Sequence, residues 1–298
     1  MPYVSIIIPA YYSAELIETC LYSLQKQTFQ NFEVIVVDST PDGATANLLE
    51  DRYPNIHAVR SSRRLLPCAA RNRGVMEATG DILVFTDPDC VAYPDWLEVL
   101  VAPHRQGHKI VGGAITCANT YRDWGIHLAK FVWWLPGGQA RACADIPTVN
   151  SSYARSVWQQ VGPFVEHRFC ADTELNWRMQ AAGQPIWFEP RAVVIHQHTT
   201  TLWQAMCERF ARGHDYAAAR VTHAHWRLRT FLYLIAFPAI PWVIILRSAD
   251  SALRAGYFRR WLLTVPMHVL CTIGWACGEA KAHVQAVFGN LPGHFLST

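Results

Sequence analysis

Two aspartates, Asp87 and Asp89, directly follow a short apolar run at residues 81–86. If that run is a buried strand, both carboxylates emerge at its C-terminal end, where ligands bind in open α/β sheets. Hard oxygen donors in that position suit Mg²⁺ or Mn²⁺ bridging a diphosphate. Two acidic residues separated by one residue are also the ordinary pattern of a solvated turn. The pair therefore indicates a metal site only if other polar residues point to the same site.

Two further groups of polar residues support such a site. Asp38 ends another apolar run, and its carboxylate could accept a hydrogen bond from a nucleobase or a ribose hydroxyl, or cap a turn. The dipeptide Asp42-Gly43 predicts a turn into the next helix. Arg71, within the run Arg71-Asn72-Arg73-Gly74, is predicted to open a helix. Helix N-terminal amides and an arginine fork there could face a phosphate, although a surface helix is the alternative.

Asp172 and two histidines lie further along the chain. Asp172 stands at the start of a predicted helix, where a carboxylate can accept a proton in a reaction or cap the helix. His196 and His198 lie on one side of an emerging strand. They could complete a metal site or bind pyrophosphate, or they could be a structural pair. Of the two, we favour His196 as a ligand.

The first third of the chain must position these groups. Short, β-branched apolar runs typical of buried parallel strands alternate with segments of helical periodicity. The expected strands are residues 4–9, 33–38, 56–60 and 81–86, and the expected helices are residues 14–27, 44–52 and 69–79. This alternation predicts a parallel sheet of the nucleotide-binding type.

The middle of the chain is less regular. We expect helices at residues 94–101, 172–182 and 202–220, strands at 109–117, 185–189 and 192–196, and a further element opening at Asn150. Residues 121–136 are rich in tryptophan and other aromatic residues. They could form a packed aromatic helix, or a surface that meets a bilayer or a lipid tail.

Two C-terminal stretches, residues 230–246 and 261–278, contain no Asp, Glu, Lys or Arg and have tryptophans and arginines nearby. Membrane contact is favoured over a buried hairpin, because such residues anchor segments at the interface. Were both stretches to span the membrane, the arginine-rich loop at 247–260 would lie outside, against the positive-inside tendency. A re-entrant pair bent at Pro238 and Pro241 avoids that conflict.

Composition narrows the function classes. A net charge of +3 gives no general support for a nucleic-acid partner. The nine cysteines contain no Cys-x-x-Cys pair, so neither a zinc knuckle nor a disulfide framework is indicated, and we expect reduced thiols in the cytoplasm. The apolar run at residues 4–10 is too short for a signal peptide, which favours a main domain on the cytosolic side.

In the order and spacing of these motifs, the sequence resembles the family 2 glycosyltransferases of the GT-A fold. The matching stretches are residues 5–11, 36–38 with 42–43, 70–74, 80–89, Asn150, 171–175 with Arg178, and 196–198. The resemblance covers residues 3–215. It implies a GT-A Rossmann-like mixed α/β sheet flanked by helices, here followed by C-terminal membrane-associated helices.

The resemblance also implies roles for individual residues. Pro9 and Tyr11 would line the nucleoside pocket, Asp38 would bind the base, and Arg71 would touch the donor. Asp87 would bind ribose or metal, and Asp89 the metal. Asp172 matches the general base that deprotonates the acceptor hydroxyl in an inverting displacement at the anomeric carbon.

Three positions depart from the family pattern. Ser39 replaces a second acidic residue after the base-binding aspartate, and this replacement would relax the contacts to the nucleobase. Ala171 replaces an acidic residue before Asp172 and removes an acceptor contact. Tyr12 replaces an asparagine after the first-motif tyrosine. Each weakens inference of the substrate by analogy.

Together these observations predict a metal-dependent inverting glycosyltransferase that uses Mg²⁺ or Mn²⁺ held by Asp87, Asp89 and His196. The donor would be a nucleotide-sugar, and the acceptor a lipid-linked glycan or a glycolipid at the cytoplasmic face of the cell membrane. Residues 1–110 would form the nucleotide-sugar-binding half, residues 111–220 the acceptor-binding half, and residues 221–298 a membrane-associated hairpin. The alternatives are a polyprenyl-phosphate glycosyltransferase and a membrane-tethered sugar-nucleotide-binding protein without catalysis.

Overall fold

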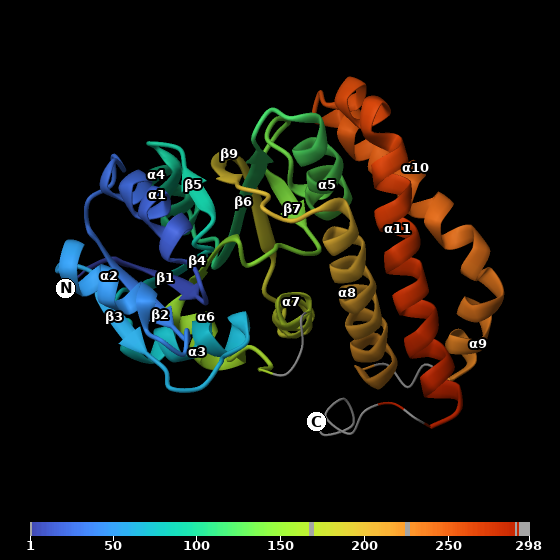
Figure 1. Cartoon of the computed structure of the whole chain (residues 1–298), viewed down its shortest axis with the longest axis horizontal. Helices are drawn as coiled ribbons and strands as arrows, with labels where there is room; N and C mark the ends of the chain where they lie inside the picture. Colours follow the sequence, from blue (N-terminus) through green and yellow to red (C-terminus); the bar gives the residue numbers. More distant parts are fainter. Residues whose placement is uncertain (1, 167–169, 224–226, 290, 292–298) are drawn as a thin grey trace. The chain divides into compact units, whose positions relative to one another are not determined.

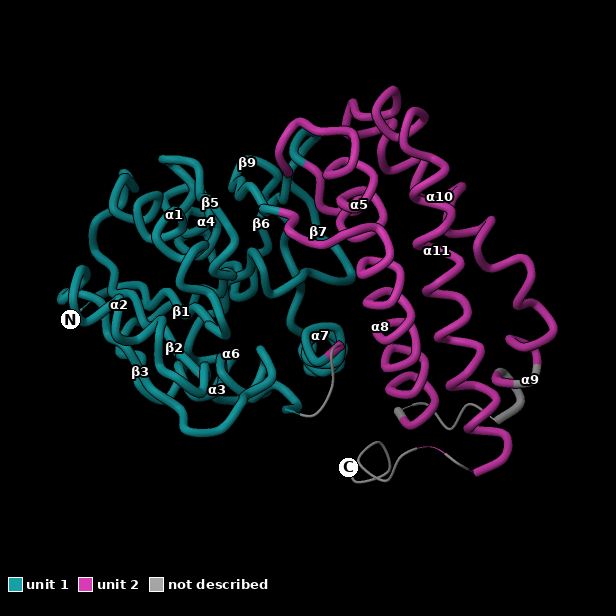
Figure 2. Tube along the Cα trace, in the orientation of Figure 1, with its two compact units in different colours: residues 1–116, 136–167, 171–197 teal, residues 117–135, 168–170, 198–298 magenta. Residues whose placement is uncertain are grey.

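A computed structural model of the chain describes residues 2–166, 170–223, 227–289 and 291. The chain divides into two compact units, shown in different colours in Figure 2. Unit 1 consists of residues 1–116, 136–167 and 171–197, and unit 2 of residues 117–135, 168–170 and 198–298. The division into a donor half, an acceptor half and a hairpin remains a prediction about function.

Unit 1 is built on a mixed sheet, whose first half is parallel (Figure 1). Its strands are β1 (Val4–Ala10), β2 (Phe32–Asp38), β3 (His57–Arg60) and β4 (Ile82–Thr86). Strand β1 pairs in parallel with both β2 and β4, and β2 pairs in parallel with β3. All residues of β1 are buried, as its uninterrupted apolar sequence predicts. The connecting helices are α1 (Ala14–Gln25), α2 (Ala44–Arg52) and α3 (Pro67–Glu77).

The second half of the sheet runs antiparallel. Its strands are β5 (Cys90–Ala92), β6 (Ile110–Cys117), β7 (Arg141–Cys143), β8 (Asn150–Ala154) and β9 (Ile186–His196). The order across the sheet is β3-β2-β1-β4-β8-β6-β9-β5, and β7 pairs with β9. Helices α4 (Trp96–Arg105), α6 (Arg155–Val161) and α7 (Ala171–Ala181) complete the unit. The predicted fold class, a mixed sheet flanked by helices, is confirmed.

Two local predictions were wrong. The expected strands at 185–189 and 192–196 are one strand, β9, which continues through Pro190. Proline lacks the amide hydrogen that a strand ladder uses, but it does not end this strand. Helix α3 begins at Pro67, so Arg71 lies one turn inside it and does not open it. Proline suits the first position of a helix, because the amide there has no partner within the helix.

Unit 2 is helical. It contains α5 (Tyr121–Phe131), the short 3₁₀ helices η1 (Val132–Trp134) and η2 (Phe237–Ala239), and the helices α8 (Leu202–His223), α9 (Arg227–Ala236), α10 (Ile240–Arg254) and α11 (Phe258–Val287). Within the described residues, two segments are long and apolar enough to cross a membrane, Leu232–Arg254 and Phe258–Val287. The first includes η2, where Pro238 interrupts the helix.

Helices α8 and α11 approach each other closely through small residues. A Cβ atom added at Gly278 would lie 2.0 Å from the carbonyl oxygen of Phe210, and one at Gly213 would lie 2.3 Å from the carbonyl oxygen of Trp275. Further along the same helices, Ala217 and Ala282 are fully buried in one cluster. Small side chains spaced four residues apart therefore bring the two backbones together.

The aromatic stretch at 121–136 is largely a packed helix. Trp124 is buried in the core of unit 2, and its ring stacks on Tyr257 at a centroid distance of 5.2 Å. Trp133 is 37% exposed and Tyr121 is 58% exposed. The packed-helix interpretation therefore holds for Trp124, whereas the side chains of Tyr121 and Trp133 are exposed.

Candidate active site

Asp87, Asp89 and His196 come together in unit 1 at the end of β4. One ligand atom from each lies within 4.8 Å of the others. The sheet explains the meeting: β5 pairs antiparallel with β9 so that Cys90 lies opposite His196, which places the histidine beside Asp89. The amide of Gln197 donates to the carbonyl oxygen of Asp89 at 2.9 Å, and this bond fixes the end of β9.

The chemistry of this set fits a divalent cation. His196 Nε2 lies 3.5 Å from Asp89 Oδ2, and all three side chains are partly exposed, so a diphosphate could share the ion. Two carboxylates and an imidazole suit Mn²⁺, and the carboxylates suit Mg²⁺. His196 is thus the histidine that joins the aspartates. His198 belongs to a different group within unit 2, together with Cys117 and His127.

Arg71 is tied to the same site. Its side chain is buried, and its guanidinium forms an ion pair with the Asp87 carboxylate. Burial lowers the pKa of the guanidinium, but the charges of Asp87 and Asp172, the Cys68 thiol and the hydrogen bond to Asp87 together outweigh it, so the pKa of Arg71 is raised above its usual value. Gly74, one turn later on α3, allows this approach, since a Cβ there would lie 2.5 Å from the side chain of Ile7. Arg71 therefore orients Asp87 and balances its charge.

Asp38 organises the loops that follow β1 and β2. Its side chain is only 2% exposed. One carboxylate oxygen accepts from the amide and the hydroxyl of Thr40, and the other accepts from the amide of Ala46 at 2.9 Å. The Thr40 hydroxyl in turn accepts from the amide of Tyr12 at 2.9 Å. Contact of Asp38 with a base stays a prediction, but this network connects the loops that follow β1 and β2.

Pro9 and Tyr11 differ in accessibility. Pro9 is buried in β1, opposite Val37 of β2. Tyr11 is 36% exposed, and the guanidinium carbon of Arg64 lies 4.7 Å from its ring centroid. Tyr11 therefore offers an aromatic face beside a cation, whereas Pro9 contributes through the backbone that it fixes. Arg64 was not among the predicted site residues, because nothing in its local sequence distinguishes it.

The three departures from the family pattern have structural consequences. Tyr12 adopts a left-handed conformation, with a φ of 49°, which asparagine enters more readily than tyrosine. Ser39 is buried, and its hydroxyl points to the carbonyl oxygen of Ala10. Ala171 is fully buried in the core of unit 1, so a carboxylate at this position would have to enter that core.

Asp172 lies in the first turn of α7, as predicted, and is partly exposed. Asp145 is a neighbouring carboxylate that sequence reasoning missed. It accepts hydrogen bonds from Asn176 and, at 3.1 Å, from the hydroxyl of Thr173, both on α7. Burial, and then the charge of Asp172, raise the pKa of Asp145 to about 7. Asp145 thus anchors the helix that carries Asp172 and places a second titratable group beside it.

Comparisons with known proteins agree with this arrangement. A family model described as "Glycosyl transferase family 2" matches residues 5–154. The chain is 30% identical over 207 residues to glycosyltransferase AglE of Haloferax volcanii, covering 66% of this chain and 67% of that protein. It is 25% identical over 248 residues to the probable glycosyltransferase YdaM of Bacillus subtilis, covering 77% of this chain and 59% of that protein.

Among solved structures, the chain resembles the mannosyltransferase PcManGT from Pyrobaculum calidifontis, determined in complex with GDP-Man and Mn²⁺. The TM-score is 0.62 with 19% sequence identity, and the match covers 96% of this chain and 88% of the other. At this level of identity the similarity establishes the fold alone.

Proposed function

Because the chain belongs to glycosyltransferase family 2, we propose that it transfers a sugar, with inversion, from a nucleotide-sugar to a hydroxyl of a lipid-linked glycan or glycolipid. The observation that carries this proposal is the meeting of Asp87, Asp89 and His196 beside the buried cation of Arg71. PcManGT, of similar fold, binds GDP-Man and Mn²⁺. A divalent cation held by these three side chains would supply charge neutralisation for the departing diphosphate.

Each residue of the site has a defined task in this reaction. Tyr11 and the loops ordered by Asp38 hold the nucleoside, while Arg71 keeps the Asp87 carboxylate oriented. Asp172 accepts the proton of the acceptor hydroxyl as that oxygen forms its bond to the anomeric carbon. The bond from that carbon to the diphosphate breaks on the opposite face, so the configuration inverts and the nucleoside diphosphate leaves.

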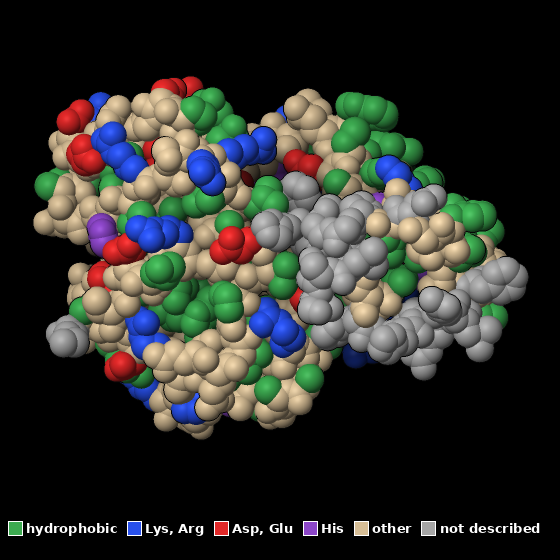
Figure 3. Space-filling model, turned by 90° about the horizontal axis from the view of Figure 1, so that it is seen from below, with side chains coloured by type: hydrophobic (Ala, Val, Ile, Leu, Met, Phe, Trp, Pro, Cys, Tyr) green, Lys and Arg blue, Asp and Glu red, His purple; other side chains and the backbone are tan. Residues whose placement is uncertain are grey.

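The C-terminal helices support an acceptor at a membrane. Figure 3 shows hydrophobic side chains gathered over these helices. The exposed large apolar residues of α10 and α11 include Trp242, Val243, Leu246, Leu262, Leu263, Leu270 and Ile273. Many exposed large apolar side chains on two neighbouring helices indicate an interaction surface for another protein or for lipid. We infer a re-entrant or interfacial attachment at the cytoplasmic face, because a spanning pair would place the arginines near 254–260 outside.

Donor binding tests the central claim. We expect at least one nucleotide-sugar to bind wild-type protein, or to be hydrolysed by it, only when Mn²⁺ or Mg²⁺ is present. Asp89→Ala should lose this metal-dependent binding while keeping the wild-type circular dichroism spectrum. Donor binding without metal, or a variant that behaves like the wild type, would contradict the proposed site.

Acceptor assays separate the remaining alternatives. Transfer to membrane extract should exceed transfer to a water-soluble sugar acceptor, and equal transfer to both would contradict a lipid-linked acceptor. Asp172→Asn should abolish transfer while leaving donor binding intact. Transfer that survives this substitution would favour a phosphate acceptor, which needs no general base, as in a polyprenyl-phosphate glycosyltransferase. Hydrolysis or transfer by the wild type excludes a pure binding protein.

A further inference from the structure

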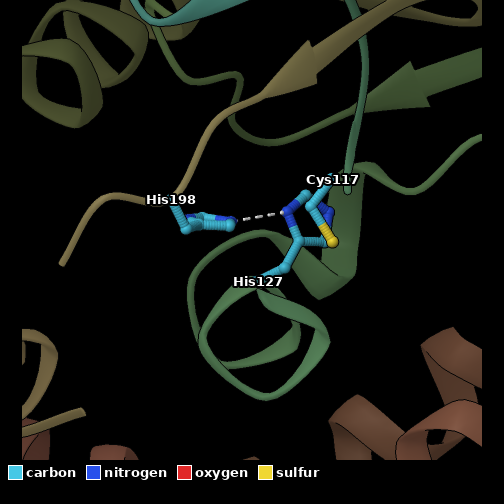
Figure 4. A group of neighbouring side chains, drawn as sticks. All are labelled: Cys117, His127 and His198. Atoms are coloured by element: carbon cyan, nitrogen blue, oxygen red, sulfur yellow. Dashed lines mark hydrogen bonds between the residues drawn. The ribbon is translucent and has the colours of Figure 1, made fainter. Parts of the chain in front are cut away.

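Unit 2 contains a compact group of three side chains that come from different parts of the fold: Cys117, His127 and His198. Cys117 ends β6, His127 lies on α5, and His198 follows β9. One ligand atom from each lies within 4.8 Å of the others, and all three residues are buried. Figure 4 shows the side chains converging, with the imidazole of His198 facing that of His127. None of the roles proposed above for sugar transfer uses this group.

We propose that these three side chains bind a zinc-type divalent metal ion. A thiolate and two imidazoles are the ligands that zinc prefers, whereas Mg²⁺ and Ca²⁺ prefer oxygen. The separation of the imidazoles supports this assignment. His127 Nδ1 and His198 Nε2 are 3.2 Å apart, and two nitrogens each about 2.0 Å from a tetrahedral ion lie about 3.3 Å apart.

The surroundings fix the two rings. The ring of His127 packs edge-on against Trp124 at 5.6 Å and tilts against Phe131 at 5.4 Å, both on α5. The ring of His198 stacks on Phe131 at 6.3 Å. The guanidinium of Arg122 donates to the backbone carbonyl of His198. The nitrogens therefore point at each other within a packed site, and little reorganisation is needed to admit an ion.

Charged groups of both signs lie near the Cys117 thiol: Asp123, which pairs with Arg122, and Arg260. Asp123, one turn before His127 on α5, is buried. Burial, and then the charge of Asp123, raise the pKa of the Cys117 thiol to about 12. A bound cation would offset both effects, so the thiol would lose its proton as the ion binds.

Such an ion would join the two long segments of unit 2. Cys117 is the first residue of the segment 117–135, and His198 is the first residue of the segment 198–298. Three protein ligands leave a fourth position for water or another small ligand. The ion would thus cross-link the places where the chain enters the unit, independently of the donor site.

Metal analysis of the purified full-length chain tests the proposal. After dialysis against metal-free buffer, we expect about one zinc ion per chain, as a three-ligand site predicts. Removing the metal with a chelator should lower the melting temperature, and zinc should restore it. Cobalt substitution of the wild type should produce the visible absorption of a tetrahedral ion and a thiolate charge-transfer band.

Variants locate the ion. Cys117→Ser combined with His127→Gln should lose the zinc, whereas Asp89→Ala should retain it, which separates this site from the donor site. The double variant Cys207→Ala, Cys277→Ala, which removes the two exposed thiols, should also retain it. The proposal would be overturned if folded wild type bound neither zinc nor cobalt, if it held copper in place of zinc, or if removal of the exposed thiols abolished binding. Because the wild-type measurements need no substitution, a misfolded variant would not obscure the result.

Discussion

The buried guanidinium of Arg71 shares the Asp87 carboxylate with the proposed metal, so its removal should affect metal and donor in opposite directions. Arg71→Met keeps most of the side-chain length and removes the charge. We expect Mn²⁺ alone to bind at least tenfold more tightly, because a tenfold change needs about 1.4 kcal/mol and charges about 4 Å apart interact by about 4 kcal/mol near a protein surface. The donor should bind at least tenfold more weakly, because the cation beside its diphosphate is lost. Calorimetric titrations of both ligands measure this.

Arg73→Met is the matched control for that substitution. Arg73 lies on the same helix, but its guanidinium pairs with Glu77 at the surface at 3.2 Å. We expect neither affinity to change in this variant, since exposed pairs contribute little. If Arg71 served only to stabilise α3, its removal would weaken the binding of both ligands together, contrary to the prediction.

Asp145 should make stability depend on pH. Its folded pKa of about 7 lies above the ordinary value of 3.8. Between these two values the folded state keeps the Asp145 proton, whereas the unfolded state has released it. The free energy of unfolding therefore falls as pH rises from about 4 through about 7. Asp145→Asn carries no ionisable group there. Relative to wild type, we expect its melting temperature to gain more at pH 8.5 than at pH 5.5, and an equal difference at both pH values would refute this.

At the scale of elements, the close packing of α8 against α11 depends on glycine. A side chain at Gly278 must displace the carbonyl group of Phe210, only 2.0 Å from the added Cβ atom. We expect Gly278→Leu to destabilise unit 2 by about 3 kcal/mol through overpacking. Cys277→Leu places the same side chain at the exposed neighbouring position and should have little effect. Thermal unfolding in mild detergent compares the two, and equal melting temperatures would contradict the packing.

Most strands and helices of unit 1 were predictable from local sequence, because apolar runs, helical periodicity and turn residues are enough to indicate them. The buried β1 and the turn at Asp42-Gly43, where Gly43 has a φ of 65°, needed no distant partner. The start of α3 was not predicted, because Leu66 at its N-cap offers no capping side chain. The sequence also predicted one break too many near Pro190, because ladder pairing around β9 overrides the local preference of proline.

The candidate site was predictable in part for the same reason. Asp87 and Asp89 follow directly from a strand end, but the choice of His196 depends on the pairing of β5 with β9. Asp145 could not be found from its neighbours, because its importance comes from the side chains of Thr173 and Asn176 on a helix far along the chain. The group at Cys117 is still less local, since it unites residues 117, 127 and 198 without a recognisable spacing.

For the molecule as a whole, the apolar surface of unit 2 supports the proposed attachment to a membrane, which vesicle binding can test. Leu262 and Leu263 on α11 are 58% and 61% exposed, and arginines recur beside them at 254, 259 and 260. We expect full-length protein to bind vesicles containing anionic lipid more tightly than neutral vesicles, because each basic residue near such a surface contributes about 1 kcal/mol. The preference should shrink as the salt concentration rises.

Substitution of the leucines separates apolar from electrostatic attachment. Leu262→Ser with Leu263→Ser should weaken vesicle binding about tenfold or more, because burial of each leucine contributes about 1.5 kcal/mol or more. Tyr22→Ser with Met76→Ser changes side chains that are 60% and 74% exposed, but on unit 1, and should leave vesicle binding unchanged. Because neither pair touches the proposed donor site, donor affinity should be the same in both variants. Equal losses of vesicle binding in the two would mean that lipid contact is not confined to the C-terminal helices, and the membrane-facing role of α11 would have to be abandoned.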